Sequence, residues 1–287
     1  GYHGWHDWYI GSTARHLGVP DAVRGLTETF KYNDAESLET LLKNSPNEFS
    51  AVILEPDGAV PVNSEFLQQV RGLTEKYGVV LIFDEIVTGF RIHMGGAQAF
   101  YGVVPDLATF GKAMGNGMPI SAIVGQQRFM KKMDDIFFSG TFGGETLSLV
   151  ASLATIHKLE EKKAVSVFSQ LGNMMMIGVE KLIAIHQMSH VLSVSGGAWW
   201  PRITVAPTEA LTVLDITSLF RQSLISQGLL LGGGFNFSLA HSDAGVADDT
   251  LSRLDASVEQ LQYYLNSDKP MQHLAGDPIQ PVFQVRK

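Results

Sequence analysis

Residues 81–91 are Leu-Ile-Phe-Asp-Glu-Ile-Val-Thr-Gly-Phe-Arg, and residues 108–117 are Ala-Thr-Phe-Gly-Lys-Ala-Met-Gly-Asn-Gly. Each stretch begins as an apolar run that predicts a buried strand, and each strand ends at a charged residue. The first strand delivers Asp84 and the second delivers Lys112. Open parallel sheets bind ligands outside the carboxyl ends of their strands. Two opposite charges at these ends therefore indicate a cofactor site.

The flanking sequence predicts a βαβ unit. Ala51 to Glu55 is a short apolar run before Pro56, which is typical of a buried strand followed by a turn. Ser64 to Tyr77 has helical spacing, with Ser64 as the expected N-cap and a stop at Gly78. Val79 to Phe83 is the next expected strand. This order predicts parallel strands with a right-handed crossover, and so an α/β fold with a mostly parallel, doubly wound sheet. Further strands are expected at 107–110 and 122–125.

The C-terminal half predicts a smaller α+β domain. Helices are expected at 144–159, 165–185, 214–227 and 248–265, and strands at 191–194 and 202–205. We expect a large domain over residues 1–165, and a linking helix, a small domain and a surface tail over residues 166–287.

The composition excludes several classes of protein. Of the 287 residues 45% are hydrophobic and 17% are charged, a balance that favours a folded globular chain. A net charge of −8 without a basic stripe argues against nucleic acid as a partner. No apolar run is long enough to predict a membrane span. The absence of cysteine excludes disulfides and cysteine-based zinc sites, and is compatible with a cytoplasmic enzyme.

Lys112 and Asp84 have the functional groups that pyridoxal 5'-phosphate requires. The cofactor needs a lysine amine for a Schiff base with its aldehyde, and a carboxylate that keeps its pyridine nitrogen protonated. Gly111, Gly115 and Gly117 would let the backbone approach a cofactor closely. The alternative is that Lys112 is a solvated loop lysine.

Five motifs in the same order resemble a known family. They are Tyr2-His3-Gly4, Ile53-Leu54-Glu55-Pro56, the Asp84 and Lys112 segments, Ser139-Gly140-Thr141-Phe142-Gly143-Gly144, and Ser238-Leu239-Ala240-His241-Ser242. Together they resemble the class III aminotransferases of the fold type I pyridoxal phosphate enzymes, and most closely the glutamate-1-semialdehyde aminomutase branch. The resemblance runs from Tyr2 to about Asp268. It places the cofactor-linked lysine at Lys112 and implies a small amino or keto compound as substrate.

The resemblance also implies roles for other residues. Tyr2 and Ile86 would lie on opposite faces of the cofactor ring, and His3 would belong to the cofactor site. Thr141 would bind the cofactor phosphate of a neighbouring subunit, which implies a homodimer; the alternative is a plain glycine turn. Glu55, at the end of its strand, is a candidate for contact with the substrate.

The pattern departs from the family in several places. Val87 and Val60 stand where many ω-amino acid transaminases carry Gln and Glu, and the region Gly232 to Ser242 lacks the arginine that those enzymes use for a substrate carboxylate. These departures favour an aminomutase-like enzyme, although transferase and mutase both remain open. The family's phosphate-binding loop would precede Tyr2, so we expect this chain to be a fragment or a processed form.

Other residues and functions are less favoured. Glu85 and His241 are interpreted as structural, and His3 with His6 does not form a metal site with clear ligand spacing. A truncated or diverged noncatalytic relative that keeps the dimer scaffold is the main alternative function. A nucleotide-binding domain ranks behind both, because no strand is followed by a Gly-x-Gly-x-x-Gly motif.

Overall fold

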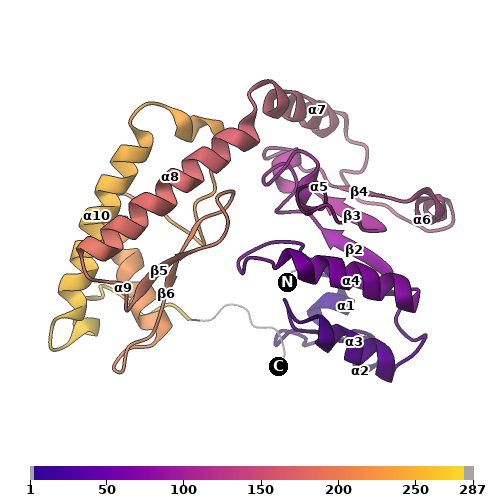
Figure 1. The fold of residues 1–287 in the computed structure, drawn as a ribbon, viewed down its shortest axis with the longest axis horizontal. Helices are drawn as coiled ribbons and strands as arrows, with labels where there is room; N and C mark the ends of the chain where they lie inside the picture. Colours follow the sequence, from indigo (N-terminus) through magenta and orange to yellow (C-terminus); the bar gives the residue numbers. More distant parts are fainter. Residues whose placement is uncertain (1–2, 281–287) are drawn as a thin grey trace. The chain divides into compact units, whose positions relative to one another are not determined.

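The computed structural model describes residues 3–280, which form two compact units (Figure 1). The N-terminal unit comprises residues 3–58 and 62–162, and the C-terminal unit comprises residues 59–61 and 163–280. Each unit contains its own sheet. In the part of the chain that is described, no helix is both long enough and apolar enough to cross a membrane.

The N-terminal unit is built on a four-stranded sheet with the order β1-β2-β3-β4. The strands are β1 (Ala51–Leu54), β2 (Val80–Asp84), β3 (Leu107–Phe110) and β4 (Ala122–Gly125). The pairs β1–β2 and β2–β3 are parallel, as the βαβ pattern predicts. β4 is antiparallel to β3. The connection from β3 to β4 is only residues 111–121, and a parallel pairing usually needs a longer crossover.

The helices of this unit vary widely in length. They are α1 (Asp7–Ile10), α2 (Asp21–Arg24), α3 (Ala35–Asn44), α4 (Ser64–Tyr77), α5 (Gly96–Tyr101), α6 (Gln127–Met130) and α7 (Thr146–Glu161), with 3-10 helices η1 (Lys112–Met114) and η2 (Lys131–Asp134). Two expected helix starts are shifted. Asn63, not Ser64, is the N-cap of α4, since its side chain accepts a hydrogen bond from the backbone of Glu65. α7 begins at Thr146 rather than Gly144, because the Glu145 carboxylate accepts the N–H groups of the first turn.

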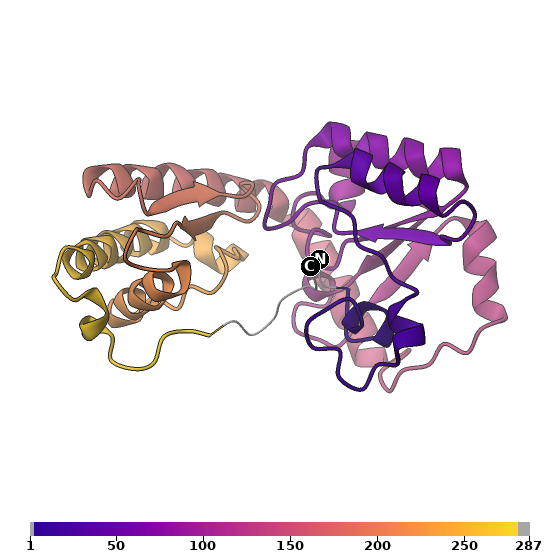
Figure 2. The same ribbon diagram turned by 90° about the horizontal axis from the view of Figure 1, so that it is seen from below.

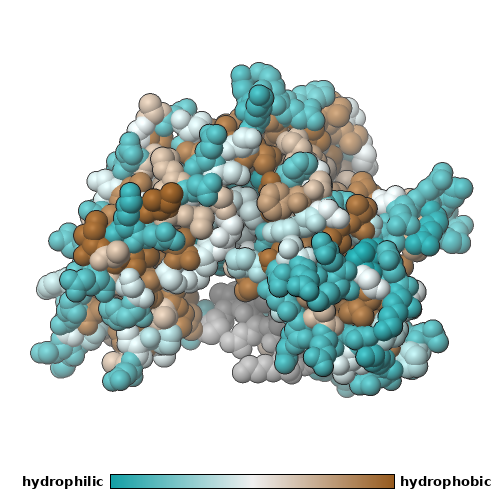
Figure 3. All heavy atoms as spheres, in the orientation of Figure 1, coloured by the Kyte–Doolittle hydropathy of each residue, from teal (hydrophilic) through white to brown (hydrophobic). Residues whose placement is uncertain are grey.

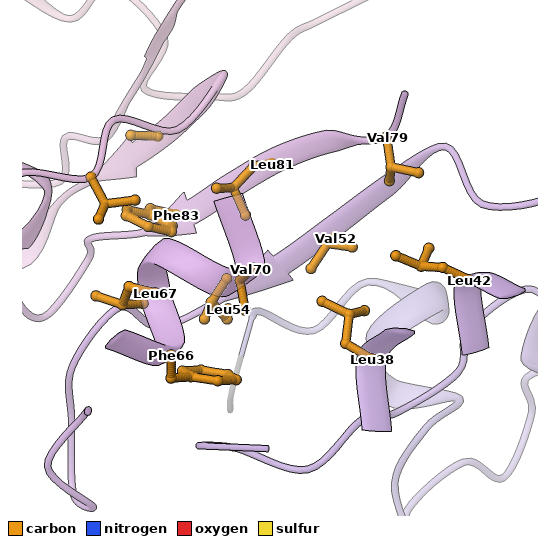
Figure 4. Packing of buried hydrophobic residues seen from close by; sticks show 12 residues of the cluster. Leu38, Leu42, Val52, Leu54, Phe66, Leu67, Val70, Val79, Leu81 and Phe83 are labelled. Atoms are coloured by element: carbon orange, nitrogen blue, oxygen red, sulfur yellow. The ribbon is translucent and has the colours of Figure 1, made fainter. Parts of the chain in front are cut away.

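The core of the unit lies between the sheet and the two helices α3 and α4, which lie side by side over one face (Figure 2). Figure 4 shows the side chains that meet there, from both helices and from the neighbouring parallel strands β1 and β2: Leu38, Leu42, Val52, Leu54, Phe66, Leu67, Val70, Leu81 and Phe83. Leu67 and Phe83 are fully buried, and burial of each such side chain contributes about 1.5–3 kcal/mol. This packing fixes the strand ends that carry the site.

The C-terminal unit is α+β, as the sequence predicts. It contains α8 (Ala164–Ile185), β5 (Leu192–Ser195), β6 (Arg202–Val205), α9 (Val213–Ser226), η3 (Leu239–Ser242), α10 (Val246–Leu265) and η4 (Pro270–His273). β5 and β6 form an antiparallel pair, and α10 packs against both α8 and α9. α9 begins with a capping box in which Thr212 and Asp215 each satisfy a backbone N–H of the other.

Candidate functional site

Asp84 ends β2 as a buried carboxylate held by three hydrogen bonds. Its side chain is 8% exposed. Oδ2 accepts a hydrogen bond from Nδ1 of His3 at 2.7 Å, and Oδ1 accepts one from the backbone N–H of Ile86 at 3.1 Å. The hydroxyl of Thr109 on β3 donates to Oδ1 at 3.3 Å. These donors fix the orientation of the carboxylate.

Lys112 follows the neighbouring parallel strand at the same edge of the sheet. Asp84 pairs with Thr109 in the β2–β3 ladder, and Lys112 lies three residues beyond Thr109. The side chain is exposed, and within residues 3–280 its Nζ makes no hydrogen bond or ion pair. The backbone of Lys112 has φ 43°, in the left-handed region that non-glycine residues avoid. Lys112 thus follows β3 at the sheet edge where Asp84 ends β2, and within the described chain its amine is not committed to another group.

Ile86 lies against the backbone that leads into Lys112. A Cβ built on Gly111 would be 3.0 Å from Cδ1 of Ile86, closer than an ordinary van der Waals contact. A larger residue at 111 would therefore push Ile86 away. Asp84, Ile86 and the segment at Lys112 form one local cluster in the N-terminal unit.

His3 is anchored by aromatic neighbours from α1. Its ring is stacked with Trp8, at a centroid distance of 6.4 Å and an interplanar angle of 13°. It meets Tyr9 edge-on at 5.7 Å. Because a carboxylate can only accept, His3 carries a proton on Nδ1 when it bonds to Asp84. His3 thus belongs to the site because it is hydrogen-bonded to Asp84. The sequence motif around His3 does not show this contact.

Glu85 has a structural role, although it is next to Asp84. It is fully buried, and both oxygens are satisfied. Oε2 accepts hydrogen bonds from the Thr88 hydroxyl and the Ala97 N–H, and Oε1 accepts from the backbone and side-chain amide of Gln98. Glu85 thereby caps the first turn of α5 and ties residues 85–98 together. No capacity is left for a cofactor or a substrate.

The other residues that the sequence predicts for the site do not all lie near Asp84 and Lys112 in the chain. Glu55 follows Leu54, which pairs with Phe83, so Glu55 and Asp84 leave their strands at the same edge. Thr141 is exposed in a turn before α7. Tyr2 lies outside the described residues. His241 accepts the backbone N–H of Ser238 on its Nδ1.

The donor set at Asp84 and Lys112 fits pyridoxal phosphate. Oδ2 of Asp84 receives one donor from His3, and a carboxylate oxygen has lone pairs for a second, such as a protonated ring nitrogen. The amine of Lys112 has no competing partner in the described chain. A metal site is a poorer description, because residues 3–280 contain no cluster of three His, Cys, Asp or Glu side chains suited to an ion. Asp84 and Lys112 thus offer the two groups that a pyridoxal phosphate site needs.

Solved structures share this fold. The chain superimposes with a TM-score of 0.85 on the FumI protein of Sphingopyxis sp. MTA144 in its internal aldimine form, at 24% identity over 96% of this chain and 66% of that one. An ω-transaminase from Sphaerobacter thermophilus matches with a TM-score of 0.78 at 23% identity, over 91% of this chain and 67% of that one. The architecture is that of fold type I transaminases.

The class III aminotransferase family model matches residues 11–198, and the chain belongs to this family. Among curated relatives, it is 37% identical to the 3-aminobutyryl-CoA aminotransferase of Cloacimonas acidaminovorans, over 73% of this chain and 51% of that protein. It is 31% identical to the glutamate-1-semialdehyde 2,1-aminomutase of Hyperthermus butylicus, over 91% of this chain and 67% of that protein. The chain thus spans about half to two thirds of the length of these relatives.

Proposed function

We propose that this chain binds pyridoxal 5'-phosphate and moves amino groups between or within small amino and keto compounds. The observation that carries the proposal is the sheet register, which pairs Asp84 with Thr109 and places Lys112 three residues further on. A buried, oriented carboxylate and an uncommitted amine follow adjacent parallel strands. Those two groups are what the cofactor requires of the protein.

The residues have distinct roles in this proposal. When bound, the cofactor supplies an aldehyde that reacts with amines and a cationic ring that draws electrons from the substrate. Lys112 would hold the cofactor through its amine and would carry a proton to or from the substrate carbon. Asp84 would lie beside the ring nitrogen and favour its protonated form. His3 orients that carboxylate through the 2.7 Å hydrogen bond.

Two side chains are proposed to enclose the cofactor ring. Ile86, held close to Gly111, packs against one face. Tyr2 supplies the other face, by resemblance to the family. Glu55 at the same sheet edge stays a predicted substrate contact, and a cytoplasmic location stays a prediction.

We also propose that the enzyme is a homodimer in which Thr141 binds the partner's cofactor phosphate. Large apolar side chains on both sides of Thr141 are exposed, and Phe137 is 97% exposed. Leu147, Val150 and Leu153 on α7 are also exposed. Figure 3 shows hydrophobic side chains at the surface along α7 and α8. A second copy of the chain is the occupant that would cover the surface formed by Phe137, Thr141 and α7.

Sedimentation velocity of the purified chain tests the dimer. Wild type is expected to sediment as a dimer, and Val150→Glu as a monomer, because a buried charge opposes association. Ile177→Glu places the same charge on an exposed residue of α8 and is the control. A monomeric wild type at high protein concentration would refute the dimer.

The relatives leave the reaction open between two forms of amino transfer. One is named an aminotransferase and the other an aminomutase. A mutase moves the amino group within one molecule, whereas a transferase needs an external keto acid. Turnover of glutamate-1-semialdehyde without added keto acid would identify a mutase, and dependence on a keto acid would identify a transferase.

The decisive experiment is a visible absorbance spectrum of the protein with added pyridoxal phosphate, before and after borohydride reduction. We expect a new absorbance band, and reduction should fix a pyridoxyl group on the peptide that contains Lys112. Lys112→Ala should lose the adduct, whereas Lys132→Ala, at another exposed lysine of the same unit, should keep it. A soluble, folded chain without any adduct would instead support a noncatalytic scaffold.

A further inference from the structure

The C-terminal unit contains an open cavity of about 500 Å³. Small-molecule sites typically have volumes of about 300–1,000 Å³. The wall is largely apolar and includes Met175, Trp200, Gly233, Gly234, Phe237 and His241. Most of the wall lies beyond residues 11–198, which the family model matches. Neither Asp84 nor Lys112 lines this cavity.

Arg202 lies against two residues that line this cavity, Trp200 and Gly233. Its guanidinium lies over the ring of Trp200, 4.8 Å from the ring centroid. Its Nη2 lies beside Gly233, where a Cβ would be 3.6 Å away. Within residues 3–280 this side chain makes no hydrogen bond and no ion pair. Partial burial also lowers the pKa of Arg202 below its usual value. A guanidinium that is half-desolvated without an acidic partner gains most from an added anion.

Gly234 keeps Arg202 in this position. A Cβ at residue 234 would lie 3.0 Å from Cγ of Arg202, 3.0 Å from Nε1 of Trp200 and 2.8 Å from the carbonyl oxygen of Pro201. Each of these contacts is closer than normal packing. The glycine loop thus allows the arginine and the indole to lie together beside the cavity wall.

His241 adds a second hydrogen-bond donor to the wall. Its Nδ1 accepts the backbone N–H of Ser238 at 2.9 Å. The neutral ring therefore carries its proton on Nε2. The cavity combines apolar walls with donors, and the described residues that line it include no carboxylate.

We propose that this cavity binds a small carboxylic acid with an apolar body, whose carboxylate pairs with Arg202. The apolar body lies against Met175, Trp200 and Phe237. A substrate of the proposed amino transfer and a separate regulatory acid share this chemistry. The segment from Gly232 to Ser242 contains no arginine, and Arg202 from β6 places its charge beside this loop.

Isothermal titration calorimetry of the whole chain, without pyridoxal phosphate, tests the proposal with octanoate and octan-1-ol as probes. Wild type is expected to bind octanoate. Arg202→Gln should weaken octanoate binding by about tenfold or more and leave octan-1-ol binding unchanged, because only the charged hydrogen bonds are lost. Arg221→Gln removes one charge from an exposed site of α9 in the same unit and should change neither.

Arg202→Lys keeps the charge but loses the planar fork, so it should bind octanoate with intermediate affinity. Circular dichroism shows whether each variant is folded. Equal octanoate affinity in wild type and folded Arg202→Gln would overturn the proposal. The proposal would also be overturned if wild type bound no octanoate at a concentration of about 10 mM, because a Kd above that value is too weak for recognition.

A further experiment tests the cavity independently of the proposed cofactor site. Lys112→Ala should bind octanoate like wild type, because Lys112 lies in the N-terminal unit and is not part of the cavity wall. Failure of the cofactor proposal would leave this result unchanged. With an active holoenzyme, competition between octanoate and the amino substrate would identify the substrate as the source. A change in kcat without competition would identify a regulatory acid.

Discussion

Replacement of Glu85 is expected to destabilise the N-terminal unit severely. Glu85 is fully buried and accepts four hydrogen bonds. Two of the donors, the Thr88 hydroxyl and the Ala97 N–H, are 2.6 Å from Oε2 and belong to buried residues. In Glu85→Ala both would be left buried without an acceptor. The two donors of Gln98 are only half-buried and can turn to water.

The size of the effect follows from these two donors. An unsatisfied buried donor costs about 1–3 kcal/mol, so Glu85→Ala should lose about 4 kcal/mol. For a unit of this size, each kcal/mol lowers the Tm by about 2–4 °C, which gives a fall of about 8–16 °C. Glu85→Gln keeps one acceptor oxygen but turns an NH₂ group toward other donors. We therefore expect about half the loss, near 2 kcal/mol.

Urea unfolding followed by far-UV circular dichroism measures the effect. The midpoint of the transition of the N-terminal unit is compared among wild type, the two Glu85 variants and Glu48→Ala. Glu48 is an exposed carboxylate in a loop of the same unit and serves as the control. If Glu85→Ala unfolds at the same urea concentration as Glu48→Ala, the interpretation of Glu85 as a structural cap is refuted.

Three other variants probe the site and the packing. Asp84→Asn should remain folded, because Oδ1 still accepts its hydrogen bonds. The variant should transfer an amino group from a donor to the cofactor about a hundredfold more slowly, or slower still, as measured by single-turnover absorbance. Gly172→Ala should lower the Tm, because a Cβ there would collide with the carbonyl oxygen of Ala198. In Gly72→Ala, the added Cβ on α4 meets no atom, and the variant should be more stable than wild type by about 0.5–1 kcal/mol. Burial raises the pKa of Asp106, but a backbone N–H and two guanidinium groups outweigh it and hold that pKa below its ordinary value. The stability that Asp106 contributes is present above the pKa of an unfolded aspartate and is lost as the pH falls through the lower pKa of the folded state. In pH-dependent urea titrations, Asp106→Asn should therefore destabilise the chain near neutral pH and have little effect in strong acid.

The strands and long helices could be predicted because their local patterns are strong. β1, β2 and β3 are apolar runs closed by Gly, Pro or charged residues, and α4 has both helical spacing and a glycine stop. The helices α1, α2, α5 and α6 have four to six residues, too few to show a period. α5 depends on hydrogen bonds to Glu85, which lies outside the helix in the sequence. No helix propensity within residues 96–101 predicts α5.

The site could be predicted only in part, because its contacts depend on register. Asp84 and Lys112 are visible as charges that end apolar runs. Thr109 is not visible, since a threonine within a strand is unremarkable until the pairing with Asp84 is known. His3 lies 81 residues from Asp84, and only the folded chain brings them within 2.7 Å. Arg202 looks like an ordinary strand residue until the glycine loop lies beside it.

The backbone conformation of Lys112 is unfavourable for a lysine. Lysine has no local hydrogen bond that favours the left-handed region, and that conformation costs a non-glycine residue about 1 kcal/mol or more. Asparagine, as at Asn116 nearby, or glycine would be the economical choice for this turn. The Lys112 side chain makes no hydrogen bond or ion pair in the described chain that would offset the cost. Packing therefore gives no reason for lysine here, whereas the proposed cofactor site does.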